Sequence, residues 1–149
     1  MRACCWRMER AAVERRDRQA LLCREPTFYL HVLIDEVALH RVMGSHELMA
    51  AQLVHLFAVA ARDNVTIQVI PFETGAYGLH FAGLTLLRYP EPDEPLSVYI
   101  EEHTGTKVVE DVKDGEGLAA AWDYAARLAL DPEQSVKRIE EVRVTRHAV

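Results

Sequence analysis

Apolar and polar positions alternate with the two-residue period of a β-strand in several short stretches of the chain. In "FYLHVLI" (28–34) both alternating faces are mostly apolar, so the pattern predicts a central strand. "VTIQVI" (65–70) predicts a second core strand. Three further strands are expected within residues 81–90, 96–101 and 106–111. Because the links between these later strands are short, we expect them to pair in antiparallel fashion.

Apolar residues at helical spacing lie before, between and after these strands. An N-terminal helix is expected over Met8–Cys23 and ends before a proline. A short helix capped by Asp35 and a longer one with an apolar stripe over Leu48–Ala60 separate the first two strands. Two C-terminal helices follow, one with an apolar stripe over Leu118–Ala129 and one that begins at the capping sequence "DPEQ" (131–134).

This order of elements predicts an α+β fold with a mixed sheet of four or five strands. The strand, helix, strand order at its start predicts one βαβ unit with two parallel strands. We expect residues 8–149 to form a single domain, which suits a chain of 149 residues, and residues 1–7 to be unstructured or an unrelated start.

Charge is distributed unevenly along the chain. Residues 1–24 contain seven arginines and three acidic residues, whereas residues 25–149 contain ten basic and twenty acidic residues. An acidic body repels a phosphate backbone, so we expect no direct nucleic-acid binding. No apolar run is long enough for a membrane span or arranged as a secretory signal, and the three cysteines form no disulfide pattern, which together favour a cytoplasmic protein.

Acidic residues cluster where two of the predicted strands end. Asp35 and Glu36 follow the first strand, and Glu101, Glu102 and His103 close the fourth. If these ends converge, their side chains could bind a divalent ion or perform acid–base chemistry. The alternative is structural: Asp35 caps a helix, Glu36 favours the helix N-terminus, and the remaining charges are solvated.

The loop "PFETGAYGLHF" (71–81) leaves the carboxyl end of a predicted parallel strand, where open α/β sheets place ligands. Its Phe72, Tyr77 and His80 are therefore candidate pocket residues, although a purely structural loop explains them equally well. The histidines lack metal-ligand spacing, and no phosphate loop or nucleophile motif is present, so we expect no metal site and no cofactor.

Several segments together resemble one bacterial domain of unknown function. That domain forms the C-terminal part of antitoxin-like transcriptional regulators and follows a helix-turn-helix of the xenobiotic-response-element type. The matching segments are "VERRDRQALL" (13–22), "IDEVALHRVMG" (34–44), "LMAAQLVHL" (48–56), "NVTIQVIPFETG" (64–75), "VYIEEHTG" (98–105) and "ALDPEQSVKRIEEV" (129–142).

The resemblance implies that a separate helix-turn-helix reads DNA, while this domain senses a ligand, oligomerises or binds a partner. Genes of the family often lie beside a gene for a small acidic protein, in a toxin–antitoxin-like arrangement. The family implies no catalytic residues. The positions that match its motifs are Arg15, Arg18, Gln19, Asp35, Glu36, Gln52, Pro71 and Glu101. The sequence contains no segment that resembles the helix-turn-helix, so we expect a truncated product, a standalone domain or a late start.

We expect a non-catalytic regulatory or interaction domain whose partner is a small neighbouring acidic protein, a helix-turn-helix relative or a second copy. The alternative is a small-molecule-binding protein or enzyme that uses a strand-end acidic pocket. A third hypothesis is a dominant-negative partner that titrates full-length relatives.

Overall fold

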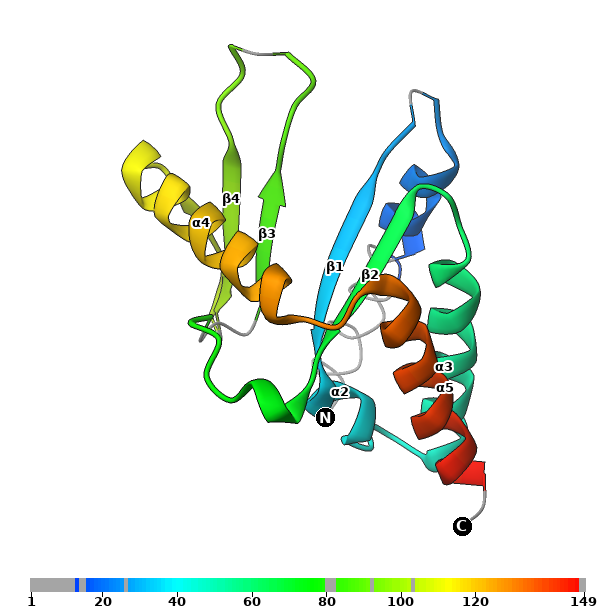
Figure 1. Cartoon of the computed structure of the whole chain (residues 1–149). Coiled ribbons are helices and arrows are strands. Elements are labelled where there is room, and N and C mark those ends of the chain that lie inside the picture. Colours follow the sequence, from blue (N-terminus) through cyan, green and yellow to red (C-terminus); the bar gives the residue numbers. More distant parts are fainter. Residues whose placement is uncertain are drawn as a thin grey trace.

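The computed structural model of the chain describes residues 13, 16–25, 27–79, 83–91, 93–102 and 104–147. Figure 1 shows two groups of elements that the C-terminal part of the chain links. The elements within these ranges confirm the α+β class. Of the predicted N-terminal helix, residues 16–19 are helical and continue into the 3-10 turn η1 (Ala20–Cys23). The predicted start at residues 1–7 lies outside the described residues.

The predicted βαβ unit is confirmed. Strands β1 (Leu30–Asp35) and β2 (Val65–Ile70) pair in parallel, with Leu30 opposite Val65 and Asp35 opposite Ile70. Helices α2 (Glu36–His40) and α3 (His46–Ala60) connect them. The side chain of Ser45 caps α3 by accepting a hydrogen bond from the Leu48 N–H.

The three later strands form a separate antiparallel sheet. Strands β3 (Gly83–Leu87), β4 (Ser97–Glu102) and β5 (Gly105–Val109) lie in that order. The turn between β4 and β5 is tight, because Glu102 pairs directly with Gly105. Gly105 has a φ of 143°, a backbone conformation that favours glycine.

The strands therefore form two sheets rather than one mixed sheet, and β1 is an edge strand rather than a central one. Of the pair, β2 is the more deeply buried strand. Its outer edge is covered by the chain between the last two helices: Val69 accepts a hydrogen bond from the Leu130 N–H and donates one to the buried hydroxyl of Ser135. This segment occupies the place that another strand would take.

Two C-terminal helices are present as predicted. Helix α4 (Val112–Leu128) packs on the antiparallel sheet and also contacts β2, while α5 (Pro132–His147) packs against β2 and α3. The main core lies between the parallel strands and α2, α3 and α5; its buried side chains are Leu39, Leu53, Val65, Ile67, Val69, Ile139 and Val142. No helix within the described ranges is both long and apolar enough to cross a membrane.

Candidate functional site

Glu36 is the most deeply buried ionisable side chain at the ends of the parallel strands. It is the first residue of α2, and its side chain is only 5% exposed. One carboxylate oxygen accepts a hydrogen bond from the Phe72 N–H at 3.0 Å, and the other accepts one from Arg138 Nη1 at 2.7 Å. His40 Nε2 lies 3.5 Å from the oxygen that Arg138 contacts. Glu36 thus connects α2 to the end of β2 and to α5.

The surroundings of Glu36 favour its charged form. Burial alone would raise its pKa, but the hydrogen bonds from Phe72 and Arg138 and the positive charge of Arg138 together lower the pKa below its ordinary value. The hydrogen bond with Glu36 likewise raises the pKa of Arg138. Glu36 is therefore a carboxylate at neutral pH and is poorly suited to donate a proton.

Asp35 also has structural partners. One of its carboxylate oxygens caps α2 by accepting a hydrogen bond from the Val37 N–H at 2.9 Å, as expected from the sequence. The other accepts a hydrogen bond from the Tyr77 hydroxyl at 2.8 Å. Burial, followed by this hydrogen bond and the charge of Asp35, raises the pKa of Tyr77 to about 12. The contact holds the loop after β2 against the end of β1.

Four of the seven candidate pocket residues therefore meet at the carboxyl ends of β1 and β2, namely Asp35, Glu36, Phe72 and Tyr77. Phe72 starts the 3-10 turn η2 (Phe72–Thr74), and its ring lies 5.5 Å from that of His40, centroid to centroid. Motif position Pro71 immediately precedes this turn.

Glu101 does not join this cluster. It lies in β4 of the other sheet, exposed, with Gly83 and Thr106 as its strand partners. Between the described residues, no hydrogen bond or ion pair connects Glu101 to Asp35 or Glu36. The candidates His80 and His103 lie outside the described residues, as does motif position Arg15. The other motif positions, Arg18, Gln19 and Gln52, are exposed on helical segments.

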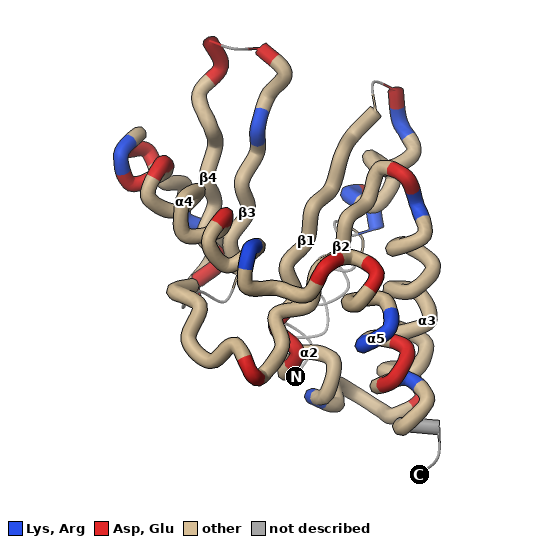
Figure 2. The backbone as a smooth tube through the Cα atoms, in the orientation of Figure 1, with Lys and Arg blue, Asp and Glu red and all other residues tan. Residues whose placement is uncertain are grey.

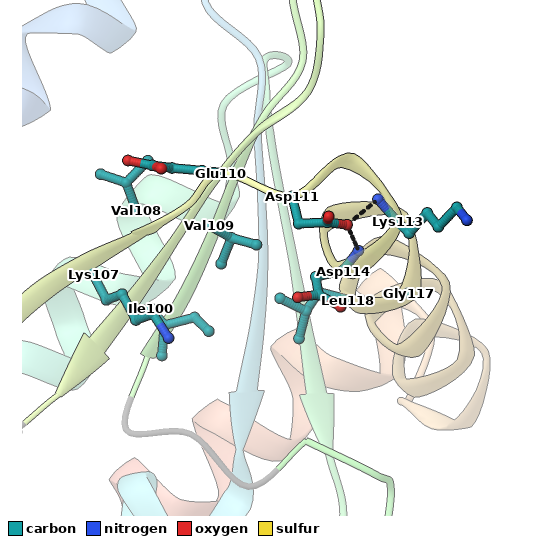
Figure 3. Close-up of a pocket in the computed structure, with 10 residues that line it drawn as sticks. All are labelled: Ile100, Lys107, Val108, Val109, Glu110, Asp111, Lys113, Asp114, Gly117 and Leu118. Carbon is teal, nitrogen blue, oxygen red and sulfur yellow. Dashed lines mark hydrogen bonds between the residues drawn. The ribbon is translucent and has the colours of Figure 1, made fainter.

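Two cavities lie near charged side chains. A cavity of about 290 Å³ opens beside Glu36 and is lined by Glu36, His40, Arg138, Glu141, Val142 and Thr145. A wider groove of about 680 Å³ runs between β5 and α4, and Figure 3 shows its lining residues. In this groove the carboxylate of Asp111 accepts hydrogen bonds from the N–H groups of Lys113 and Asp114, so it serves as the helix cap. The described residues include no cluster of His, Cys, Asp or Glu suited to hold a metal ion.

Helix α3 has an exposed side that is mostly apolar, a feature that the acidic residues at the strand ends do not predict. Its buried side is narrow and centres on Met49 and Leu53. The opposite side, which we call the outward face of α3, is exposed and consists of Glu47, Leu48, Ala51, Val54, His55 and Ala58. In Figure 2 the α3 tube is free of charged residues over most of its length. Helix α3 has one acidic residue, Glu47 in its first turn, and no lysine or arginine, so most of its exposed side lacks formal charge.

Neither the role of Arg138 nor the outward face of α3 was predicted from the sequence. Arg138 lies 102 residues from Glu36, and nothing local in its helix indicates a buried carboxylate as its partner. The signal for the outward face is present in the sequence: α3 has one acidic residue, Glu47, and no lysine or arginine in its 15 residues. The predicted stripe treated Leu48 and Phe57 as core residues, but they are 51% and 43% exposed.

A family model described as a domain of unknown function (DUF5753) matches residues 6–141. The comparisons with curated proteins and with solved structures gave no match. Because the family model covers most of the chain, the chain belongs to the DUF5753 family.

Proposed function

We propose that the chain is a non-catalytic interaction domain of a transcriptional regulator, with a protein as its partner. One observation carries the proposal: the outward face of α3 is an exposed apolar surface with Leu48 and Val54 about half exposed. Exposed apolar patches on soluble proteins commonly mark sites of protein association. Burial of such side chains releases about 25 cal/mol per Å² of apolar area, which favours a partner that covers them.

The strand-end acids support a structural rather than a catalytic role for that region. Both carboxylate oxygens of Asp35 and of Glu36 are occupied by partners within the chain. A general acid or base needs a pKa near the working pH, whereas the pKa of Glu36 is lowered. The acidic composition of the chain argues against direct DNA binding, so DNA recognition belongs to a helix-turn-helix partner or segment in this proposal.

The partner in this proposal is a small neighbouring acidic protein, a helix-turn-helix relative or a second copy of the chain. If the partner is itself acidic, the net charge of −6 on this chain opposes association. The contact would then depend on apolar burial, which fits the scarcity of charge on α3.

Co-purification from a bacterial lysate tests the proposal. Val54→Glu places a charge within the outward face, and Val144→Glu makes the same change on α5, where Val144 is similarly exposed (54% against 50%). We expect the wild-type chain and Val144→Glu to retain the same bound protein and Val54→Glu to lose it by about tenfold or more. Equal recovery by all three chains would contradict the proposal.

The cavity beside Glu36 supports a second candidate function, the binding of a small molecule. Its volume of about 290 Å³ is at the lower limit for ligand pockets. A ligand that raises the unfolding temperature of the wild-type chain and of Glu101→Gln, but not of Glu36→Gln, would support this function. A ligand whose effect is the same in all three chains would count against it.

A further inference from the structure

We infer that the groove between β5 and α4 binds an extended segment of a basic partner protein, which adds to the free edge of β5 as a further strand. The inference goes beyond the proposed function, because it concerns another surface and another kind of contact. Strand β5 comes last in the sheet order β3, β4, β5, so only one of its edges is paired. Within the described residues, no hydrogen bond reaches the backbone of the other edge. An unpaired edge of this kind can accept an extended peptide through backbone hydrogen bonds.

The register of the sheet places apolar side chains beside this edge. Val109 pairs with Val98, and both side chains lie on the face of the sheet that α4 covers. Two residues along the strands, Lys107 pairs with Ile100 on the same face. In Figure 3, Ile100 and Val109 lie on the strand side of the groove and Leu118 lies on the helix side. A strand added at the edge of β5 would place every second side chain toward these apolar residues.

Two glycines in α4 shape the helix side of the groove. Gly115 packs against the sheet, since a Cβ at this position would lie 3.5 Å from Cγ2 of Val98. At Gly117, by contrast, a Cβ would meet no atom within 4 Å apart from its neighbours in the helix, so this side of the groove is open. The groove volume of about 680 Å³ lies within the range of sites that hold a ligand. The open space at Gly117 is therefore available to the side chains of a bound segment.

The charge around the groove favours a basic partner. Residues 101–116 contain six acidic residues and two lysines. Glu110 and Asp114 line the groove, and within the described residues neither side chain has a hydrogen bond or an ion pair, so both can pair with lysine or arginine of a bound segment. The net charge of −6 on the chain attracts a basic protein and repels an acidic one or a second copy. The expected occupant is therefore a segment in which apolar and basic residues alternate.

Peptide binding tests the inference. The probe is a fluorescent peptide of about eight residues that alternates valine and lysine, and fluorescence anisotropy measures its binding to the full chain at physiological salt. We expect a dissociation constant in roughly the micromolar range. A peptide with the same side chains but methylated backbone nitrogens cannot donate the hydrogen bonds between strands, so it should bind about tenfold more weakly or worse. A peptide that alternates valine and glutamate should also bind more weakly, because its charge is repelled.

Two pairs of variants locate the binding site. Gly117→Leu fills the groove and should weaken binding of the valine–lysine peptide by about tenfold, whereas Ala120→Leu adds a leucine to an exposed position of α4 outside the groove and should not. Leucine is a good helix former, so neither substitution should unfold α4. Asp114→Lys should also weaken binding, and Glu116→Lys, the same change of charge at an exposed residue outside the groove, should weaken it less. Val54→Glu lies on α3 and should bind the peptide as the wild type does.

Weaker binding by Gly117→Leu and Asp114→Lys than by their controls, together with weaker binding of the methylated peptide, would support the inference. If the wild-type chain does not bind the valine–lysine peptide, the inference is wrong. Equal binding by Gly117→Leu and Ala120→Leu, by Asp114→Lys and Glu116→Lys, or of the two peptides that differ in methylation would also overturn it, because general attraction between charges would then account for the binding. These results leave the proposed function untouched, since that function depends on the outward face of α3.

Discussion

Glu36 shows how residues distant in the sequence determine the role of a charged side chain. Its position after a strand and before a short helix is visible in the sequence, and so is the capping role of its neighbour Asp35, because caps depend on local order. Its partner Arg138 comes from the last helix, 102 residues away. A local pattern contains no information about that pairing, so a catalytic acid and a structural carboxylate were both compatible with the sequence.

At the residue scale, Glu36→Ala should lower the free energy of unfolding by about 1–3 kcal/mol, because it leaves the partly buried Arg138 with only Glu141 as an acidic partner and the Phe72 N–H without its acceptor. Urea unfolding measures the change. Glu101→Ala is the control, since Glu101 is exposed, and should change the stability by less than about 0.5 kcal/mol. Equal effects of the two substitutions would contradict the structural role of Glu36.

The same carboxylate predicts a dependence of stability on pH. The pKa of Glu36 in the folded chain lies below its ordinary value of 4.5, so the unfolded chain binds this proton more readily. The stabilisation is therefore fully present above pH 4.5 and is lost as the pH falls through the pKa of the folded state. Unfolding of wild-type chain and Glu36→Gln between about pH 7 and pH 3 should show a steeper loss in the wild type. Parallel curves would show that Glu36 contributes nothing to the acid sensitivity.

At the scale of elements, periodicity and capping signals predicted most strands and helices well. The parallel pairing of β1 with β2 was predicted correctly, but the central position of β1 was not, because apolar residues on both faces indicate burial of the faces and not which edges are hydrogen-bonded. Leu130 and Ser135 cover the outer edge of β2 through hydrogen bonds with Val69. The sequence around these two residues shows no strand pattern. The start of α5 was predicted correctly because its cap is encoded within four residues.

That cap gives a prediction at the same scale. Asp131 accepts a hydrogen bond from the Gln134 N–H at 2.7 Å, and the Gln134 side chain accepts one from the Asp131 N–H at 3.3 Å. Asp131→Ala should lower the free energy of unfolding by about 1 kcal/mol. Asp123→Ala, which removes only an exposed ion pair with Arg88, should have a smaller effect in the same unfolding experiment. The reverse order of effects would contradict the role of the cap.

At the scale of the whole molecule, the sequence predicted the composition of the fold but not the division of its strands between two sheets. That division depends on contacts between distant segments, such as α4 against both β2 and the antiparallel sheet. The apolar outward face of α3 is likewise a property of the assembled molecule, because only the packing of Met49 and Leu53 determines which side of the helix is left exposed.

The most direct test of the proposed interaction surface is photo-cross-linking in the cell, with a photoreactive phenylalanine analogue at position 54 or, as the control, at position 144. We expect a discrete adduct, heavier than the single chain by the mass of one partner, from position 54 and not from position 144. Both positions are exposed to a similar degree, so random collisions label them equally. Equal labelling from both positions, or no adduct from position 54, would contradict the role of α3 as the interaction surface.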